Sequence, residues 1–270
     1  MDSLRASAPD WVVDFGNSRV KLGVFTGPED PVVFRDQEAW LHAQEQVAAG
    51  KPPHRILWAA SGAVPAAWKS WRKQLTGRNG GPHFHELNPG WEPPFAVQIA
   101  GRFTLGLDRL AHAAAVIARD PEAHWMVVDA GTILTCDLIV KGCLVGGTLS
   151  PGMDMRFLSM YQGTARLPWL AGWRDMLPRT APSSGEPKTP LPGVGHETVT
   201  AMLLGVRDGM RTEILGRATL WEQHAHPLKI ILTGGDAHFL DFNGGGSIFA
   251  DDKLTLRGFH ALLKHLAETN

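Results

Sequence analysis

The sequence predicts an α/β protein whose chain is organised as two similar halves. One apolar run ends at Asp14 and another ends at Asp129, and a glycine follows each aspartate two positions later. A second apolar stretch comes next in both cases, at 20–25 and 134–140, so each segment has the pattern of a β-hairpin. Strand-like and helix-like segments then alternate, an order typical of a sheet covered by helices. This recurrence favours two related halves.

The first half opens with the hairpin at about 11–25 and continues with alternating elements. Short runs of β-type residues predict strands, and longer amphipathic runs predict helices. The expected elements are a helix at 37–49, a buried parallel strand at 56–60, a helix from Pro65 to about Leu75, a strand at 83–87 and a helix at 110–118.

The second half begins near residues 116–124 and follows a similar order. We therefore expect an N-terminal tail at 1–10, a first domain at 11–118 and a second domain at 119–270. The proline-rich segment 168–195 is predicted to be an exposed loop or lid, and Gly244–Gly246 a second flexible spot. The expected elements are strands at 125–129, 134–140 and 143–149, helices at 152–161 and about 197–220, a strand at 229–233 and a final helix at 256–268.

Composition argues against several classes of protein. The chain has 270 residues, and 44% of them are hydrophobic, which is enough for a globular core. The formal net charge of −1 gives no excess of positive charge that would attract nucleic acid or an anionic membrane surface. Cys136 and Cys143 have neither zinc-ligand spacing nor the number needed for a disulfide framework, so we expect two packed thiols in a reducing cytoplasm. No apolar stretch has the length of a leader or a membrane span, so a cytoplasmic protein is expected.

The turn of the first hairpin carries residues suited to holding phosphates. Gly16 lets the backbone approach a phosphate closely, and the N–H groups of tight turns bind anions. Asp14 can hold Mg²⁺, directly or through water, and Lys21 can reach a phosphate as a point charge. The alternative is an ordinary β-turn around Asn17 with a solvated lysine. This segment alone does not decide between the two.

Asp129, Gly131 and Thr132 repeat the same arrangement in the second hairpin. A plain turn is again the alternative. Two Asp-x-Gly turns that each follow a Val-Val strand nevertheless favour a functional role. We therefore expect the two hairpins to face one nucleotide.

A third candidate segment, Gly106 to Arg109, precedes an alanine-rich helix. Asp108 is predicted to be the N-cap of a helix that begins near Arg109. A carboxylate in this position can also accept a proton from a substrate hydroxyl, while the neighbouring arginine binds a substrate carboxylate. Spacing alone favours the cap, and the two roles are compatible.

Two further glycine turns are candidates for ligand contact, and several known motifs are missing. The segments 146–152 and 233–236 either shape a binding crevice and support an adenosine, or simply connect elements.

The sequence has no P-loop, no Gly-x-Gly-x-x-Gly after a strand and no Gly-x-Ser-x-Gly elbow, which argues against P-loop kinases, Rossmann dehydrogenases and α/β-hydrolases. Its 12 histidines are scattered without a metal-ligand set.

Taken together, these segments resemble the type III pantothenate kinases, members of the acetate and sugar kinase, Hsp70 and actin superfamily. Each motif alone is weak, but the set occurs in the family's order and is specific as a set. The matching segments are 14–21, 106–109, 129–132 with Thr135 and Asp137, 146–152, 164–168, 198–205 and 233–235.

The resemblance implies two ribonuclease-H-like (actin-like ATPase) subdomains, with mixed sheets flanked by helices and ATP in a cleft between them. It also implies Mg²⁺ with the ATP, a monovalent cation (potassium or ammonium), and a homodimer that helps to form the pantothenate site. No nucleic acid or membrane partner is expected.

The family's site residues carry over to the matching positions. Asp108 would be the general base, and Asp129 would bind the monovalent cation. Pantothenate would contact Gly106, Leu107, Asp108, Arg109 and Thr198. ATP would contact Thr132 and the segment Asp14, Phe15, Gly16, Asn17, Ser18, Arg19, Val20 and Lys21.

The chain departs from the family pattern at two positions. Ser18 stands where the family usually has threonine, which keeps the hydroxyl. Ile99 occupies the position of a substrate-contacting tyrosine, and Phe103 is the aromatic residue that can replace it.

We therefore predict ATP-dependent phosphorylation of pantothenate to 4′-phosphopantothenate, the first step of coenzyme A biosynthesis, with Asp108 as base. Two alternatives stay open at this stage. One is a nucleotide-binding regulatory or accessory protein without catalysis, which the missing tyrosine favours. The other is a kinase for a different small hydroxylated substrate on the same scaffold.

Overall fold

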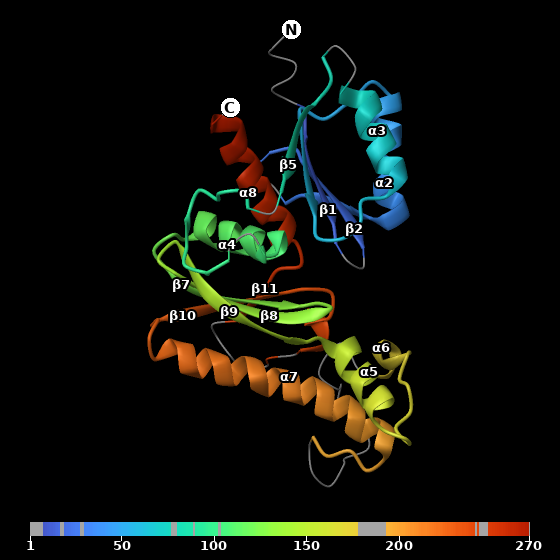
Figure 1. The fold of residues 1–270 in the computed structure, drawn as a ribbon, viewed down its shortest axis with the longest axis vertical. Coiled ribbons are helices and arrows are strands. Elements are labelled where there is room, and N and C mark those ends of the chain that lie inside the picture. The colour runs from blue at the N-terminus through green and yellow to red at the C-terminus, as the bar shows by residue number, and fades with distance from the viewer. Residues whose placement is uncertain are drawn as a thin grey trace. The chain divides into compact units, whose positions relative to one another are not determined.

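The computed structural model describes residues 8–16, 19–27, 30–76, 80–88, 90–101, 104–177, 193–240, 242 and 248–269 (Figure 1). The chain divides into two compact units. The first comprises Met1–Pro121 and Lys253–Asn270, and the second comprises Glu122–Asp252. The division lies close to the boundary expected after residue 118. The final helix, which was assigned to the second half from the sequence, belongs to the first unit.

A mixed sheet with strand order β3-β2-β1-β4-β5 forms the centre of the first unit. β2 pairs antiparallel with β1 and β3, whereas β4 pairs parallel with β1 and β5. A two-residue strand, β6 (Ala96–Val97), follows later in the chain. The strands of the sheet are β1 (Asp10–Phe15), β2 (Val20–Phe25), β3 (Val32–Arg35), β4 (Arg55–Ala60) and β5 (His83–Leu87).

One face of this sheet carries an aromatic core beneath α2 (Asp36–Ala48) and α3 (Ala66–Thr76), which lie together on one side in Figure 1. Side chains of a strand alternate between its two faces. Trp11, Val13 and Phe15 of β1 therefore point the same way, and all three join this core with Trp68 and Trp71 of α3. The intervening residues of β1, including Asp14, point to the opposite face.

The opposite face is covered by α8 (Leu254–Thr269), which packs against α4 (Leu107–Arg119). His260 Nε2 of α8 lies 3.1 Å from Asp10 Oδ2 at the start of β1. The two helices cross so closely that a Cβ on Gly258 would come within 1.8 Å of the Ala111 carbonyl oxygen. Only glycine allows this approach, so α8 fixes the position of α4.

The second unit contributes five strands to a mixed sheet, in the order β11-β10-β7-β8-β9. β8 pairs antiparallel with β7 and β9, whereas β10 pairs parallel with β7 and β11. The sheet therefore has the same succession of antiparallel and parallel pairs as the first. Its strands are β7 (His124–Ala130), β8 (Ile133–Val140), β9 (Cys143–Pro151), β10 (Leu228–Thr233) and β11 (Ile248–Ala250).

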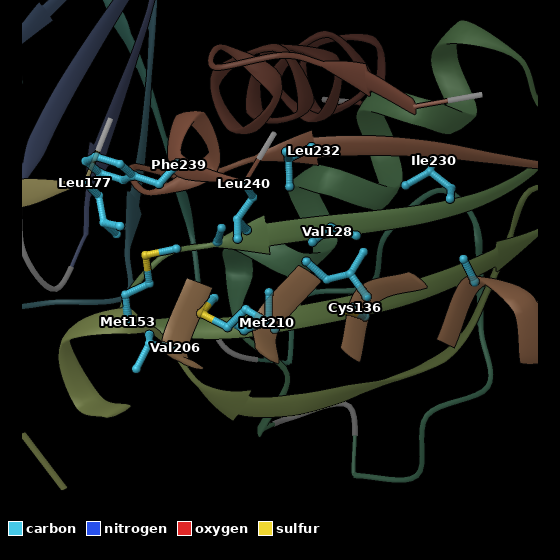
Figure 2. Close-up of a cluster of buried hydrophobic side chains, with 14 of the residues drawn as sticks. Val128, Cys136, Met153, Leu177, Val206, Met210, Ile230, Leu232, Phe239 and Leu240 are labelled. Carbon is cyan, nitrogen blue, oxygen red and sulfur yellow. The ribbon is translucent and has the colours of Figure 1, made fainter. Parts of the chain in front are cut away.

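A hydrophobic core joins one face of the second sheet to its helices (Figure 2). Val128 and Leu232 from the sheet meet Met210 of the long helix α7, while Met153 of α5 and Phe239 extend the cluster. Because side chains alternate along β7, Asp129 points to the opposite face. The helical elements are α5 (Met153–Gly163), α6 (Trp173–Met176), α7 (Thr198–Glu222) and the 3₁₀ turn η2 (Ala237–Phe239).

The expected α/β fold with two mixed sheets flanked by helices is confirmed. Of the two thiols expected to pack in the interior, Cys136 is buried and Cys143 is only half-buried, and burial raises the pKa of the Cys136 thiol to about 12. Gly244–Gly246, the start of the expected tail and residues 178–192 of the proline-rich segment lie outside the described residues. No helix in the described part of the chain is both long and apolar enough to cross a membrane.

Candidate functional site

The β1–β2 hairpin places the first set of candidate residues. Asp14 is opposite Lys21 and Phe15 is opposite Val20 in the antiparallel pair. The Gly16 N–H donates to the Arg19 carbonyl at 3.0 Å and closes the turn. Asp14 is buried, with an exposed fraction of 7%. Asn17 and Ser18, which were expected to contact ATP, lie outside the described residues.

Two polar contacts support this hairpin from neighbouring segments. The Phe15 carbonyl accepts the N–H groups of Ser61 and Gly62, at 3.1 and 2.8 Å, directly after β4. The Asp36 carboxylate accepts the Val20 N–H at 2.9 Å, although Asp36 is the first residue of α2 and has a positive φ of 50°. Sequence reasoning missed Asp36, because its bond spans 16 residues and depends on an unusual backbone conformation.

The β7–β8 hairpin places the second set in a different environment. Asp129 is opposite Thr135, and the Gly131 N–H donates to the Ile133 carbonyl at 3.3 Å. The Gly152 N–H donates to the Thr132 carbonyl at 3.1 Å. A Cβ on Gly152 would lie 2.1 Å from the Gly131 carbonyl oxygen, so these two backbones are in direct contact.

The end of β10 meets the same hairpin. Thr233 pairs with Asp129, and the Asp236 N–H donates to the Ala130 carbonyl at 2.9 Å. Gly234 has a φ of 99°, and a Cβ there would come within 2.4 Å of Asp129 Oδ1. The structure thus brings together three segments that were singled out separately in the sequence: 129–132, 146–152 and 233–236.

The meeting of these three segments does not create a cluster of ionisable side chains within the described ranges. No group of three or more His, Cys, Asp or Glu residues that could hold a metal occurs among the residues described. Asp129 instead supplies one carboxylate, whose Oδ1 and the Ala130 carbonyl both lie 2.4 Å from the position of a Cβ on Gly234.

Asp108 lies in the first turn of α4 rather than at its cap. The helix starts at Leu107 with Gly106 as N-cap, so the prediction that Asp108 caps a helix beginning near Arg109 is wrong. Its Oδ1 accepts the Arg109 N–H at 2.9 Å. A carboxylate in the first turn interacts favourably with the helix dipole, which explains why an acid is stable there without being the cap.

The remaining substrate candidates are divided between the units. Thr198 is the exposed first residue of α7, directly after Glu197, which forms a capping box with Thr200. Ile99 is half-buried in the first unit, and Phe103 lies outside the described residues. Asp14 and Asp108 belong to the first unit, whereas Asp129, Thr132 and Thr198 belong to the second.

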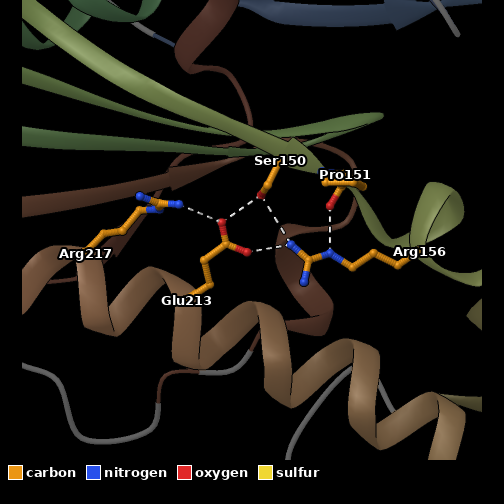
Figure 3. Close-up of polar contacts among 5 residues, drawn as sticks. All are labelled: Ser150, Pro151, Arg156, Glu213 and Arg217. Atoms are coloured by element: carbon orange, nitrogen blue, oxygen red, sulfur yellow. Dashed lines mark hydrogen bonds and ion pairs between the residues drawn. The ribbon is translucent and has the colours of Figure 1, made fainter.

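A polar network missed by sequence reasoning links α7 to the junction between β9 and α5 (Figure 3). Glu213 accepts the Ser150 hydroxyl at 2.8 Å and pairs with Arg156 Nη2 at 2.5 Å. Arg156 Nε also donates to the Pro151 carbonyl at 2.7 Å. Burial alone would raise the pKa of Glu213, but hydrogen bonds from Arg156, Ser150 and Arg217 lower it. The network therefore stays charged and holds the residues just before Gly152.

A second network lies on the other side of that junction. Arg174 of α6 makes a bidentate pair with Asp154, at 3.1 and 2.7 Å, and reaches Asp236 at 2.9 Å. Trp173 Nε1 donates to Asp154 at 2.6 Å. Burial raises the pKa of Asp236 despite the arginine. At Asp154 burial acts in the same direction, but the bonds from Arg174 and Trp173 outweigh it and lower the pKa.

Comparisons with known proteins agree on one family. The family model described as type III pantothenate kinase matches residues 11–219. A type III pantothenate kinase of Phocaeicola vulgatus is 31% identical over 257 residues, 94% of this chain and 97% of the relative. Another, from Christiangramia forsetii, is 33% identical over 172 residues, 63% of this chain and 65% of the relative.

Solved structures support the fold alone. A protein from Campylobacter jejuni described as a Baf family transcriptional activator superposes with a TM-score of 0.54 at 19% identity, covering 96% of this chain and 99% of that one. A protein from Sinorhizobium meliloti described as a 2-dehydro-3-deoxygalactonokinase superposes with a TM-score of 0.51 at 14% identity, covering 95% and 98%.

Proposed function

Because the chain belongs to the type III pantothenate kinase family, we propose that it transfers the γ-phosphoryl group of ATP to the primary hydroxyl of pantothenate. The products are 4′-phosphopantothenate and ADP, in the first step of coenzyme A biosynthesis. The observation that carries this proposal is the pair of Asp-x-Gly hairpins in sheets of the same topology, within a family match that spans both units.

The two hairpins supply the groups that bind the triphosphate. Asp14 organises Mg²⁺, and Lys21, opposite it in the strand pair, neutralises a phosphate oxygen. The segment from Asp14 to Lys21 and Thr132 make the ATP contacts. Asp129 would hold potassium or ammonium, which would offset negative charge on the phosphates. Positioning and charge neutralisation of this kind account for most of the rate in phosphoryl transfer.

Asp108 is the general base in this proposal. One of its oxygens accepts the Arg109 N–H, which orients the carboxylate, and the other takes the hydroxyl proton. The new oxygen–phosphorus bond forms as the bond to the β-phosphate oxygen breaks, and ADP leaves. Arg109 pairs with the carboxylate of pantothenate, and Gly106, Leu107 and Thr198 complete its contacts in a homodimer in the cytoplasm.

The role of Asp108 as general base is tested by the variant Asp108→Asn. Turnover should fall by about 10²-fold or more, within the usual contribution of a general base, while ATP binding stays close to normal. Asp208→Asn is the matched control, because Asp208 is a half-buried helical aspartate beside an arginine, Arg207, with no place in the site. Turnover near the normal value in the Asp108 variant would remove this residue from the role.

The activity is tested by measuring ADP release with pantothenate, with other small hydroxylated compounds and with no acceptor, each with and without potassium. We expect release that depends on pantothenate and increases with potassium. Equal or faster release with another acceptor would identify a kinase for that compound. Nucleotide binding without release under any condition would favour the regulatory alternative, which the isoleucine at position 99 motivates.

A further inference from the structure

The network around Arg174 connects two carboxylates that lie far apart in the sequence. Asp154 is in the first turn of α5, and Asp236 follows β10. Arg174 binds both, and its guanidinium carbon lies 4.3 Å from the ring centre of Trp173, a fully buried side chain. The guanidinium group is thus held between the ring of Trp173 and two carboxylates, although the Arg174 side chain is 43% exposed.

Each carboxylate lies within two residues of a glycine that touches the β7–β8 turn. Asp154 follows Gly152, whose N–H binds the Thr132 carbonyl. Asp236 follows Gly234 and donates its own N–H to the Ala130 carbonyl. Arg174 therefore joins the two backbone segments between which the turn is held.

These contacts leave little room for the turn to shift while the segments stay in place. A Cβ would come within 2.1 Å of turn backbone at Gly152 and within 2.4 Å at Gly234, so the three backbones are in van der Waals contact. Asp236 also has a side-chain exposure of only 7%, and Arg174 is its ion-pair partner. Loss of the arginine would remove this link between the two segments and leave the buried Asp236 carboxylate without its cation.

We propose that Arg174 is a positioning residue of the nucleotide site, which holds Gly152 and Gly234 against the Gly131–Thr132 turn through Asp154 and Asp236. This inference rests on the proposed function, because the position of the turn can affect the KM for ATP only if ATP binds at this turn. The two terminal nitrogens of Arg174 are occupied by carboxylates, so it acts through them and not by direct contact with the nucleotide.

The test compares Arg174→Gln with Arg174→Lys. The glutamine variant should raise the KM for ATP by about 10-fold, equivalent to ~1.4 kcal/mol, and leave the KM for pantothenate within about 2-fold. Lysine keeps the positive charge but lacks the planar guanidinium group that binds two carboxylates, so the KM for ATP of Arg174→Lys should lie between those of the glutamine variant and the unsubstituted protein. Arg207→Gln, which removes an arginine paired with Asp208 on α7, is the control and should change neither constant.

Hydrogen exchange separates this proposal from the proposed function. Peptides that cover 129–135 should exchange faster in Arg174→Gln than in the unsubstituted protein, whether or not pantothenate is a substrate. If the glutamine variant does not fold, Asp236→Asn tests the same connection, because it keeps an acceptor but removes the charge. Unchanged exchange together with an unchanged KM for ATP, or equal increases in both KM values, would overturn the role of Arg174.

Discussion

The β1–β2 and β7–β8 hairpins have the same place in two sheets of the same topology, yet they are supported in different ways. The first is held by polar groups: the Asp36 carboxylate binds Val20, and two N–H groups bind the Phe15 carbonyl. The second is held by backbone hydrogen bonds from the Gly152 and Asp236 N–H groups and by close backbone packing against Gly152 and Gly234. Hairpins with the same sequence pattern are therefore supported by a side-chain hydrogen bond in one unit and by glycines that allow close backbone contact in the other.

This difference predicts opposite responses to mutation. The first hairpin should be sensitive to loss of an acceptor oxygen and less sensitive to added volume, because a Cβ on Gly16 would lie 3.1 Å from the Arg19 carbonyl oxygen. The second should be sensitive to a single added methyl group, because close-packed backbones cannot move apart without breaking their hydrogen bonds.

The largest effect is expected for Gly234→Ala. The methyl group would overlap Asp129 Oδ1 and the Ala130 carbonyl, and alanine would also be forced to a φ of 99°. Overpacking and backbone strain together should cost about 3 kcal/mol in the free energy of unfolding. Gly235→Ala, at the next position, is the control, because nothing lies within 4 Å of a Cβ there. Urea unfolding of both variants is the measurement, and equal midpoints would contradict the packing argument.

An intermediate effect is expected from the buried acids, which respond to pH in opposite directions in the two units. Burial alone would raise the pKa of Asp10, but hydrogen bonds from His260 and Arg55 lower it from 3.8 to about 2. Its stabilisation of ~2 kcal/mol is present above about pH 4 and lost as the pH falls toward 2. Asp236 has a raised pKa, so its contribution to stability is lost as the pH rises above 3.8.

Thermal unfolding between pH 7 and about pH 2 checks this contrast. Asp10→Asn should lower stability at pH 7 and flatten the acid limb of the profile, whereas Asp236→Asn should not lower stability at pH 7. An acid limb that stays unchanged in Asp10→Asn would show that the Asp10 cluster does not control acid unfolding.

The smallest effect is expected at Asp36, where three substitutions separate backbone strain from hydrogen bonding. Asparagine tolerates a positive φ and keeps an acceptor, glycine keeps only the backbone conformation, and alanine keeps neither. Alanine should be destabilised by about 1 kcal/mol relative to asparagine. Glycine should retain stability but raise the KM for ATP a few-fold, within the ~1 kcal/mol of one hydrogen bond. A glycine variant with unchanged ATP kinetics would mean that the first hairpin needs no such support.

Much of the architecture was predictable because local patterns carry it. Alternating apolar residues predict the strands, and the two Asp-x-Gly segments predict the turns that connect β1 to β2 and β7 to β8. The ordered motifs also predicted the family, which the comparisons confirm. Contacts between distant residues were not predictable. Nothing local in the sequence indicates that Arg174 binds Asp236, or that Asp36 has a positive φ and binds Val20.

The sequence by itself determined the two hairpins and the alternation of strands and helices, and it indicated the candidate residues for binding phosphates and cations, because each depends on neighbours along the chain. Tertiary structure alone decided that 253–270 joins the first unit and that Gly152 and Gly234 enclose one turn. The physical reason is that close packing and ion pairing depend on distances between segments. Many arrangements of the same helices and strands satisfy the local pattern, and only one brings these groups into contact.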